Sequence, residues 1–269
     1  MVPTPVWKTG DWRKLVGVQF LLPLPKRIIN IFMIKTLEAV TYDFQPADLF
    51  IDIGGNVGLW TVELFGLYER IFFVEPSQTA IDDAKQRINT HCDYFQVPHL
   101  KNKVSYFKNL CSDIAGEKKS IASTTSDTGN FSIYAEELYG SQNVQMAEAD
   151  IETINVDSLI PLVKENAKVM IKIDTEGCDL DIIIGATEFI KKFKPVLIVE
   201  FHWHMYYDQV KRDKVFNLLQ SLGYNIQTYI FGCYVDNPET VFDLVHNGEQ
   251  MKNLHFQAAF TPPANIAPF

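Results

Sequence analysis

The sequence predicts an α/β fold in which a mostly parallel sheet carries helices on both faces. Residues 48–58 read Asp-Leu-Phe-Ile-Asp-Ile-Gly-Gly-Asn-Val-Gly, an apolar run that breaks into glycines, and an amphipathic stretch follows. This pattern is typical of a buried strand, a tight turn and the start of a helix. Residues 70–75 form a second apolar run, which ends in an acid. Strand, turn, helix and strand together make the unit from which parallel sheets are built.

The remaining elements continue this alternation. Helical periodicity is expected at 78–90, after Ser77, which can cap that helix, and again at 208–222 before Gly223. Further strands are expected at 104–110, 168–174, 195–201, 224–231 and 254–260.

Composition limits the classes of function. The chain has 269 residues, of which 47% are hydrophobic, enough for one sizeable domain with additions. A formal net charge of −9 argues against a broad nucleic-acid footprint. The four cysteines include no C-x-x-C pair, so we expect reduced thiols and a cytoplasmic protein.

Domain boundaries are expected near residues 46 and 260. The apolar run 15–24 superficially resembles a signal peptide, but Pro23 and Pro25 interrupt it and it is too short to span a bilayer. We therefore expect 1–46 to be a helical extension, packed on the core or on another subunit of a homo-oligomer. The main domain would cover 47–260, and 261–269 would be a proline-rich tail.

The glycine turn and the acids beside it indicate an adenosine ligand. Glu75, at the end of the second strand, can accept hydrogen bonds from two ribose hydroxyls. Asp52 would repel a pyrophosphate but would attract the sulfonium and ammonium groups of S-adenosylmethionine. The spacing Asp52-x-Gly54-x-Asn56-x-Gly58 also departs from the dinucleotide pattern G-x-G-x-x-G and resembles the first motif of class I methyltransferases. The alternative is a glycine turn that serves only to pack the helix on the sheet.

Two later segments have open interpretations. Ser112 or Asp113, after the third strand, is a candidate to bond the adenine amine, or is simply part of a turn. Residues 117–150 read as an inserted β-hairpin, which would either form one wall of a substrate site or be a solvated loop.

Five motifs, taken together, resemble the FkbM-type methyltransferases. They are Phe50-Ile-Asp-Ile-Gly-Gly-Asn-Val-Gly58, Val74-Glu-Pro76, Lys172-Ile-Asp-Thr-Glu-Gly177, Gly185-Ala186 and Lys194-Pro-Val-Leu-Ile-Val-Glu200. The resemblance covers about 47–201, and Gly55 and Thr175 depart from it, where alanine and valine are usual. It implies a Rossmann-like class I methyltransferase fold with a seven-stranded sheet, S-adenosylmethionine as donor, and O-methylation of a sugar or natural product. The residues expected to bind the cofactor are Asp52, Gly54, Gly55, Asn56, Gly58, Glu75, Pro76, Ser112, Asp113 and Asp174.

Methyl transfer to an alcohol also needs a proton acceptor. Asp174, Glu176 and His202 all follow strands whose carboxyl ends face the donor, so these three are the candidate catalytic residues. His202 suits a base near neutral pH. A metal site is the less favoured alternative, with Asp174, Glu200 and His202, joined by Glu176 and His204, as candidate ligands.

The acceptor is expected to be a small molecule or glycan rather than a nucleic acid, and no transmembrane segment is expected. Two other functions stay open. One is a non-catalytic binding module that keeps the methyltransferase fold. The other is an NAD-dependent dehydrogenase, which the glycine spacing and Asp52 disfavour.

Overall fold

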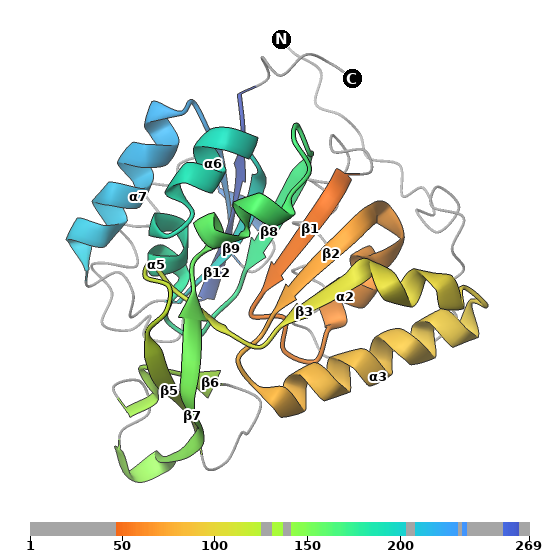
Figure 1. Cartoon of the computed structure of the whole chain (residues 1–269). Coiled ribbons are helices and arrows are strands. Elements are labelled where there is room, and N and C mark those ends of the chain that lie inside the picture. Colours follow the sequence, from red (N-terminus) through yellow and green to blue (C-terminus); the bar gives the residue numbers. More distant parts are fainter. Residues whose placement is uncertain are drawn as a thin grey trace.

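A computed structural model of the chain describes residues 47–124, 131–136, 141–202, 208–230, 233–235 and 255–263. The predicted N-terminal extension, most of the predicted tail and His204 lie outside these ranges. In the described ranges, the main sheet has eight strands in the order β11-β10-β12-β9-β8-β1-β2-β3 (Figure 1). These strands are β1 (Ala47–Ile53), β2 (Tyr68–Val74), β3 (Val104–Phe107), β8 (Val169–Ile173), β9 (Val196–His202), β10 (Asn225–Ile230), β11 (Cys233–Val235) and β12 (His255–Thr261).

The prediction of a mostly parallel sheet is confirmed. The five strands from β9 to β3 are parallel, whereas β12 runs antiparallel to both β9 and β10, and β10 and β11 form an antiparallel pair. The resemblance implied seven strands, and the eighth is the short strand β11 at the edge of the sheet. The predicted strand at 104–110 is wrong in its length, because β3 ends at Phe107 and residues 110–111 join a second sheet.

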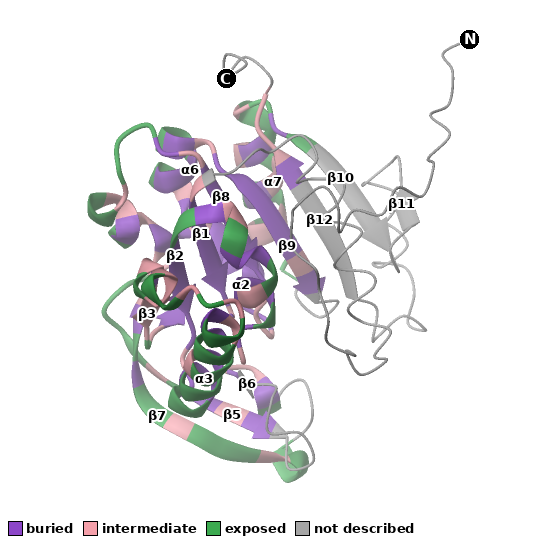
Figure 2. Ribbon diagram, turned by 90° about the vertical axis from the view of Figure 1, so that its right-hand side faces the viewer, coloured by how far each residue is buried: buried purple, intermediate pink, exposed green. Residues whose placement is uncertain are grey.

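Helices cover both faces of the main sheet, as predicted. Alternate residues of β1 point to opposite faces, so that Leu49, Ile51 and Ile53 lie in one hydrophobic cluster and Phe50 lies in the other. The first cluster includes residues of α5, α6 and α7, and the second includes residues of α2 and α3. Figure 2 shows the central strands buried between these two layers. The helices are α2 (Leu59–Leu64), α3 (Gln78–Tyr94), α5 (Asp179–Ile184), α6 (Thr187–Phe193) and α7 (Gln209–Ser221), with 3-10 helices η2 (Phe65–Leu67), η3 (Pro98–Lys103), η4 (Ser141–Asn143) and η5 (Val156–Leu162).

None of the helices in the described ranges combines the length and the apolar composition that crossing a bilayer requires.

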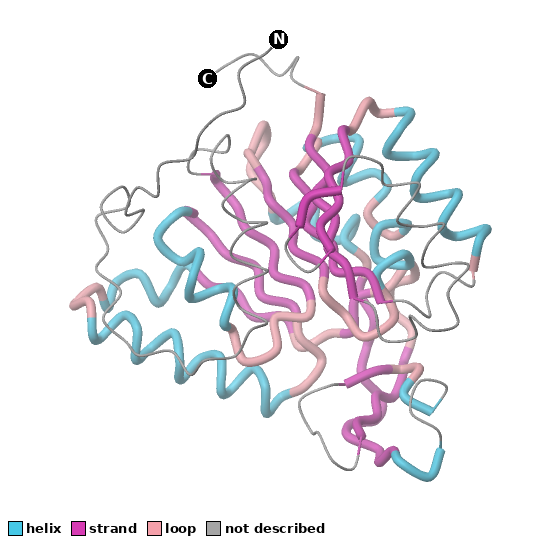
Figure 3. Tube along the Cα trace, turned by 180° about the vertical axis from the view of Figure 1, so that it is seen from behind, coloured by secondary structure: helices cyan, strands magenta, loops and turns pink. Residues whose placement is uncertain are grey.

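The insertion is more than the predicted hairpin. It forms a second sheet of order β4-β7-β5-β6, from β4 (Leu110–Cys111), β5 (Lys118–Thr124), β6 (Phe131–Ser132) and β7 (Val144–Ile154). Strand β5 pairs antiparallel with both β6 and β7, and β4 pairs in parallel with the end of β7. The small sheet lies apart from the main sheet, beyond the carboxyl ends of the parallel strands (Figures 1 and 3).

Candidate functional site

The glycine turn begins directly after β1 and is held against the neighbouring strands. The backbone N–H groups of Gly54 and Gly55 both donate to the carbonyl of Val74, at 3.0 and 3.3 Å. Gly54 has a φ of 70°, and a Cβ placed on it would lie 1.9 Å from the carbonyl oxygen of Asp174. Only glycine allows this approach, because a side chain would occupy the space of the loop after β8. The turn therefore lies between the ends of β2 and β8.

The second half of the turn leads into α2 and touches α3. Asn56 and Gly58 have positive φ values of 47° and 76°, and Gly58 is the N-cap residue of α2. A Cβ on Gly58 would lie 3.0 Å from the Cβ of Ala84 in α3. Both the backbone conformation and the close approach of the two helices therefore favour glycine at this position.

Glu75 follows β2 and is bound to the turn. Its Oε2 accepts the backbone N–H of Asn56 at 2.9 Å, and its Oε1 accepts the backbone N–H of Ser77 at 2.9 Å. Ser77 in turn caps α3 by accepting from the N–H of Ala80 at 3.3 Å. Glu75 is only 4% exposed. Burial raises the pKa of Glu75 to about 7, although the two backbone hydrogen bonds oppose this shift.

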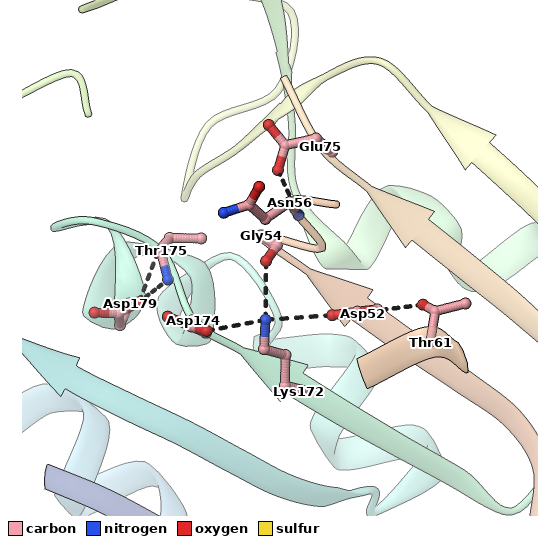
Figure 4. A network of polar contacts seen from close by, with 9 residues as sticks. All are labelled: Asp52, Gly54, Asn56, Thr61, Glu75, Lys172, Asp174, Thr175 and Asp179. Atoms are coloured by element: carbon pink, nitrogen blue, oxygen red, sulfur yellow. Dashed lines mark hydrogen bonds and ion pairs between the residues drawn. The ribbon is translucent and has the colours of Figure 1, made fainter. Parts of the chain in front are cut away.

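Asp52 lies at the end of β1, on the side of the turn away from Glu75 (Figure 4). It is completely buried, and its Oδ2 accepts the hydroxyl of Thr61 in α2 at 2.7 Å. Its Oδ1 lies 3.3 Å from the Nζ of Lys172. Both carboxylate oxygens of Asp52 therefore face neighbouring side chains, Thr61 and Lys172. These side chains would lie between the charge of Asp52 and a ligand.

Lys172 connects the elements around Asp52. Its Nζ donates to the carbonyl of Gly54 at 2.8 Å and lies 3.2 Å from the Oδ2 of Asp174 (Figure 4). Burial alone would lower the pKa of Lys172, but the carboxylates of Asp174 and Asp52 outweigh burial and raise it. Lys172 is thus an ammonium group that donates hydrogen bonds and has no lone pair with which to accept a proton.

The charges at this point do not cancel. Lys172 balances one of the two carboxylates, and the carboxylate of Glu200 at the end of β9 adds a further negative charge near it. The side chain of Asp174 is 28% exposed, against 4% for Lys172 and 0% for Asp52. The excess negative charge therefore reaches the surface at Asp174, and also at Glu200, which is partly exposed.

The loop after β8 is braced from both sides. The backbone N–H and the hydroxyl of Thr175 donate to Asp179 Oδ1, at 2.9 and 2.6 Å. The second bond needs a hydroxyl, so the departure from the usual valine at 175 has a structural consequence. The carbonyl of Glu176 accepts a hydrogen bond from the hydroxyl of Ser132 in β6. This bond attaches the inserted sheet to the loop that carries Asp174 and Glu176, two of the three candidate catalytic residues.

Ser112 and Asp113 lie at the point where the chain leaves β4. Ser112 is buried, its N–H donates to the carbonyl of Ile154 at 2.9 Å, and its hydroxyl lies 3.1 Å from Asp113 Oδ1. Asp113 is partly exposed. A Cβ on Gly185 would lie 2.4 Å from the carbonyl oxygen of Ser112, so this motif glycine lets the end of α5 pack against the segment. Whether either side chain meets adenine stays a prediction.

The candidate base and metal ligands are only partly described. Glu176 and Glu200 are partly exposed, and the backbone of His202 ends β9 opposite His255 of β12. The side chain of His202 lies outside what the structure describes, as does His204. Across the described residues, no group of three or more His, Cys, Asp or Glu side chains is arranged to hold a metal ion.

Sequence reasoning missed Lys172 as a member of the site. Lys172 belongs to a quoted motif and to the predicted strand at 168–174, but neither the motif nor the strand predicts a partner for it. The available signal was a lysine between Ile171 and Ile173 in a run whose other residues are buried, because a buried lysine needs a partner. Thr61 and Asp179 were also missed, and their partners could not be read from local sequence.

The fold and the site together define a chain of the class I methyltransferase type, with a glycine turn and acidic strand ends at the carboxyl edge of the sheet. The sequence pattern described as "Methyltransferase FkbM domain" matches residues 52–226. The chain therefore belongs to the FkbM methyltransferase family, and the resemblance stated from its motifs is confirmed.

Solved structures with a similar fold are distant in sequence. Methyltransferase FkbM from Methylobacillus flagellatus KT is 15% identical over 81% of this chain and 44% of that one, with a TM-score of 0.48. This chain thus spans less than half of that protein's length. A putative methyltransferase from Streptococcus mutans, solved in complex with SAH, is 9% identical over 89% of this chain and 100% of that one, with a TM-score of 0.46. No curated protein matches the sequence.

Proposed function

We propose that this chain is an S-adenosylmethionine-dependent methyltransferase that methylates a hydroxyl group of a sugar, a glycan or a small natural product. The observation that carries the proposal is the placement of Glu75. Each of its oxygens accepts one backbone N–H, which leaves acceptor capacity on both for the two hydroxyls of a ribose. The carboxylate stands beside a glycine turn at the carboxyl edge of a parallel sheet, where ligands of such folds bind.

The charge of the site supports S-adenosylmethionine over a dinucleotide. Asp52 and Asp174 outnumber Lys172, and the exposed member of this group is a carboxylate. Such a site attracts the sulfonium and α-ammonium groups of S-adenosylmethionine and repels a pyrophosphate. Gly54 has no side chain, and its close contact with the carbonyl of Asp174 brings the turn and the loop after β8 together at one edge of this site.

When bound, S-adenosylmethionine supplies an activated methyl group, which the acceptor oxygen takes while the carbon–sulfur bond breaks and the sulfur keeps its electron pair. The protein must place the acceptor in line with that bond and receive the hydroxyl proton. Asp174, Glu176 and His202 are the proposed catalytic residues, with His202 the proposed base. Pro76, Ser112 and Asp113 complete the proposed cofactor site.

The inserted sheet is the proposed wall of the acceptor site. Ser132 donates to the carbonyl of Glu176, and Glu148 of β7 accepts the backbone N–H of Gln78 at the start of α3 at 2.7 Å. These contacts tie the insertion to two segments at the carboxyl edge, beside the proposed cofactor site. A sugar or natural product as acceptor is the expectation that the family resemblance supports.

Calorimetric titration with S-adenosylmethionine, S-adenosylhomocysteine and NAD tests the donor. We expect micromolar binding of the two S-adenosyl compounds, none of NAD, and a marked loss in Glu75→Gln. Glu69→Gln, an exposed acid on the same strand, is the matched control and should bind as the wild type does. Failure of both S-adenosyl compounds to bind would leave a non-catalytic module as the better proposal. Labelled donor with a panel of glycans and lipid-linked sugars would then identify the acceptor.

A further inference from the structure

Lys172 is a buried charge that touches three parts of the site at once. It reaches the carbonyl of Gly54 in the turn, the carboxylate of Asp52 at the end of β1, and the carboxylate of Asp174 after β8. Its side chain is 4% exposed, so the ammonium group is surrounded by these partners. A buried ammonium group is costly unless its charge is matched, and here the two carboxylates and the carbonyl of Gly54 supply that match.

The bond to Gly54 fixes the orientation of one peptide group. The carbonyl of Gly54 and the N–H of Gly55 belong to the same planar peptide. The carbonyl accepts from Lys172 at 2.8 Å, while the N–H donates to the carbonyl of Val74 at 3.3 Å. Rotation of this peptide would break both bonds. Without Lys172, this peptide group would keep the hydrogen bond from Gly55 N–H to Val74 but would lose the one to its carbonyl, so its orientation would be less well fixed.

The position of Lys172 relates it to one end of the proposed ligand. Figure 4 shows Glu75 and Asn56 on one side of Gly54, and Asp52, Lys172 and Asp174 on the other. If the ribose is held by Glu75, the amino-acid part of S-adenosylmethionine extends from the ribose across the turn toward Asp174. Lys172 contacts Gly54 and Asp174, which both lie along this proposed path.

We propose that Lys172 is a positioning residue that joins the glycine turn to the loop after β8 and so sets the contacts of the turn and of Asp174 with the amino-acid part of the donor. This inference rests on the proposed function. Lys172 acts through Gly54 and Asp174. It holds their carbonyl and carboxylate in place, and it balances the charge of Asp52, the buried carboxylate beside it.

Two ligands that differ only at the amino-acid end test the proposal. S-adenosylhomocysteine carries that part, whereas 5′-methylthioadenosine has the adenosine and sulfur without it. Lys172→Met keeps much of the side-chain length and removes the charge. We expect it to raise the Kd of S-adenosylhomocysteine about tenfold or more and to change that of 5′-methylthioadenosine by less than about threefold. Lys191→Met, on the exposed face of α6, is the control and should change neither.

A second variant separates positioning from stability. Lys172→Met leaves Asp52 buried without its ion pair, which lowers stability. Asp52→Asn with Lys172→Met removes both charges, so we expect the melting temperature to recover while the weak binding of S-adenosylhomocysteine persists.

The proposal is overturned if Lys172→Met weakens both ligands equally, if it weakens neither, or if the double variant restores wild-type affinity for S-adenosylhomocysteine. Those results describe a residue that serves the fold alone. Wild-type protein that binds neither ligand would instead refute the proposed function, and this inference with it.

Discussion

The backbone N–H of Asn56 donates to Glu75 Oε2 at 2.9 Å, so the glycine turn after β1 and the acid after β2 are linked directly. The link passes through a carboxylate that is buried and that also accepts from the N–H of Ser77. Stability and ligand binding should therefore both depend on the protonation of this one group.

The first prediction concerns stability against pH. Burial raises the pKa of Glu75 from 4.5 to about 7, so the folded state holds the proton more tightly than the unfolded state does. The stabilisation that this proton binding gives is then present in full below pH 4.5. As pH rises through 7, the free energy of unfolding falls by about 3 kcal/mol. Glu75→Gln cannot titrate. The difference in free energy of unfolding between variant and wild type, measured by urea denaturation at pH 5 and pH 8, should change by this order. An equal difference in free energy of unfolding at pH 5 and pH 8 would contradict a raised pKa for Glu75.

The second prediction concerns protons released on binding. Ribose hydroxyls donate to the ionised form of Glu75, so binding should lower the pKa of this group and expel a proton where it was protonated. Titration with S-adenosylhomocysteine at pH 6, in two buffers of different ionisation enthalpy, should give different heats. The heats should agree at pH 8.5. They should also agree at pH 6 in Glu75→Gln, titrated at a protein concentration high enough to measure its weaker binding. Identical heats at pH 6 in the wild type would show that Glu75 does not change protonation on binding.

The third prediction concerns the departure from the family pattern at Gly55. A Cβ on Gly55 would lie 2.3 Å from the ring of Phe73, which is fully buried in β2. Gly55→Ala should therefore lower the free energy of unfolding by about 1–3 kcal/mol, through overpacking. Phe73→Leu should reduce this cost when the two changes are combined, since it removes the clashing ring atoms.

Gly66→Ala is the control for Gly55→Ala, because a Cβ at Gly66 would meet nothing within 4 Å. Its effect should stay within about 0.5 kcal/mol. Equal effects of the two alanine variants, or no coupling between Gly55→Ala and Phe73→Leu in a double-mutant cycle, would count against the packing explanation.

Local patterns predicted the parallel core well. Strands β1, β2, β8 and β9 are apolar runs bounded by turn residues, and Gly54 and Glu75 mark where two of them end. Such signals lie within a few residues of each other, so the sequence displays them directly. The family resemblance added the order of the motifs, which the match over residues 52–226 confirmed.

Long-range partners could not be read in the same way. Lys172 and Gly54 are 118 positions apart, and nothing near either residue indicates the other. Strand β7 was missed for a different reason: most of its residues up to Asp150 are exposed, so it lacks the apolar alternation of a half-buried strand. The close approach of Gly55 to Phe73 was hidden in the same way, because Phe73 belongs to another strand.

The fourth prediction concerns the buried hydrogen bond that Asp52 accepts from the hydroxyl of Thr61. The Oγ1 of Thr61 donates to Asp52 Oδ2 at 2.7 Å, and both residues are fully buried. Thr61→Val keeps the shape and removes the donor, which leaves a buried carboxylate oxygen unsatisfied. We expect a loss of about 1–3 kcal/mol in the free energy of unfolding. Thr90→Val, on the exposed side of α3, removes a hydroxyl that bonds the carbonyl of Gln86 and should cost less than about 0.5 kcal/mol. Urea denaturation measures both. A Thr61→Val variant as stable as the wild type would mean that Lys172 alone satisfies Asp52.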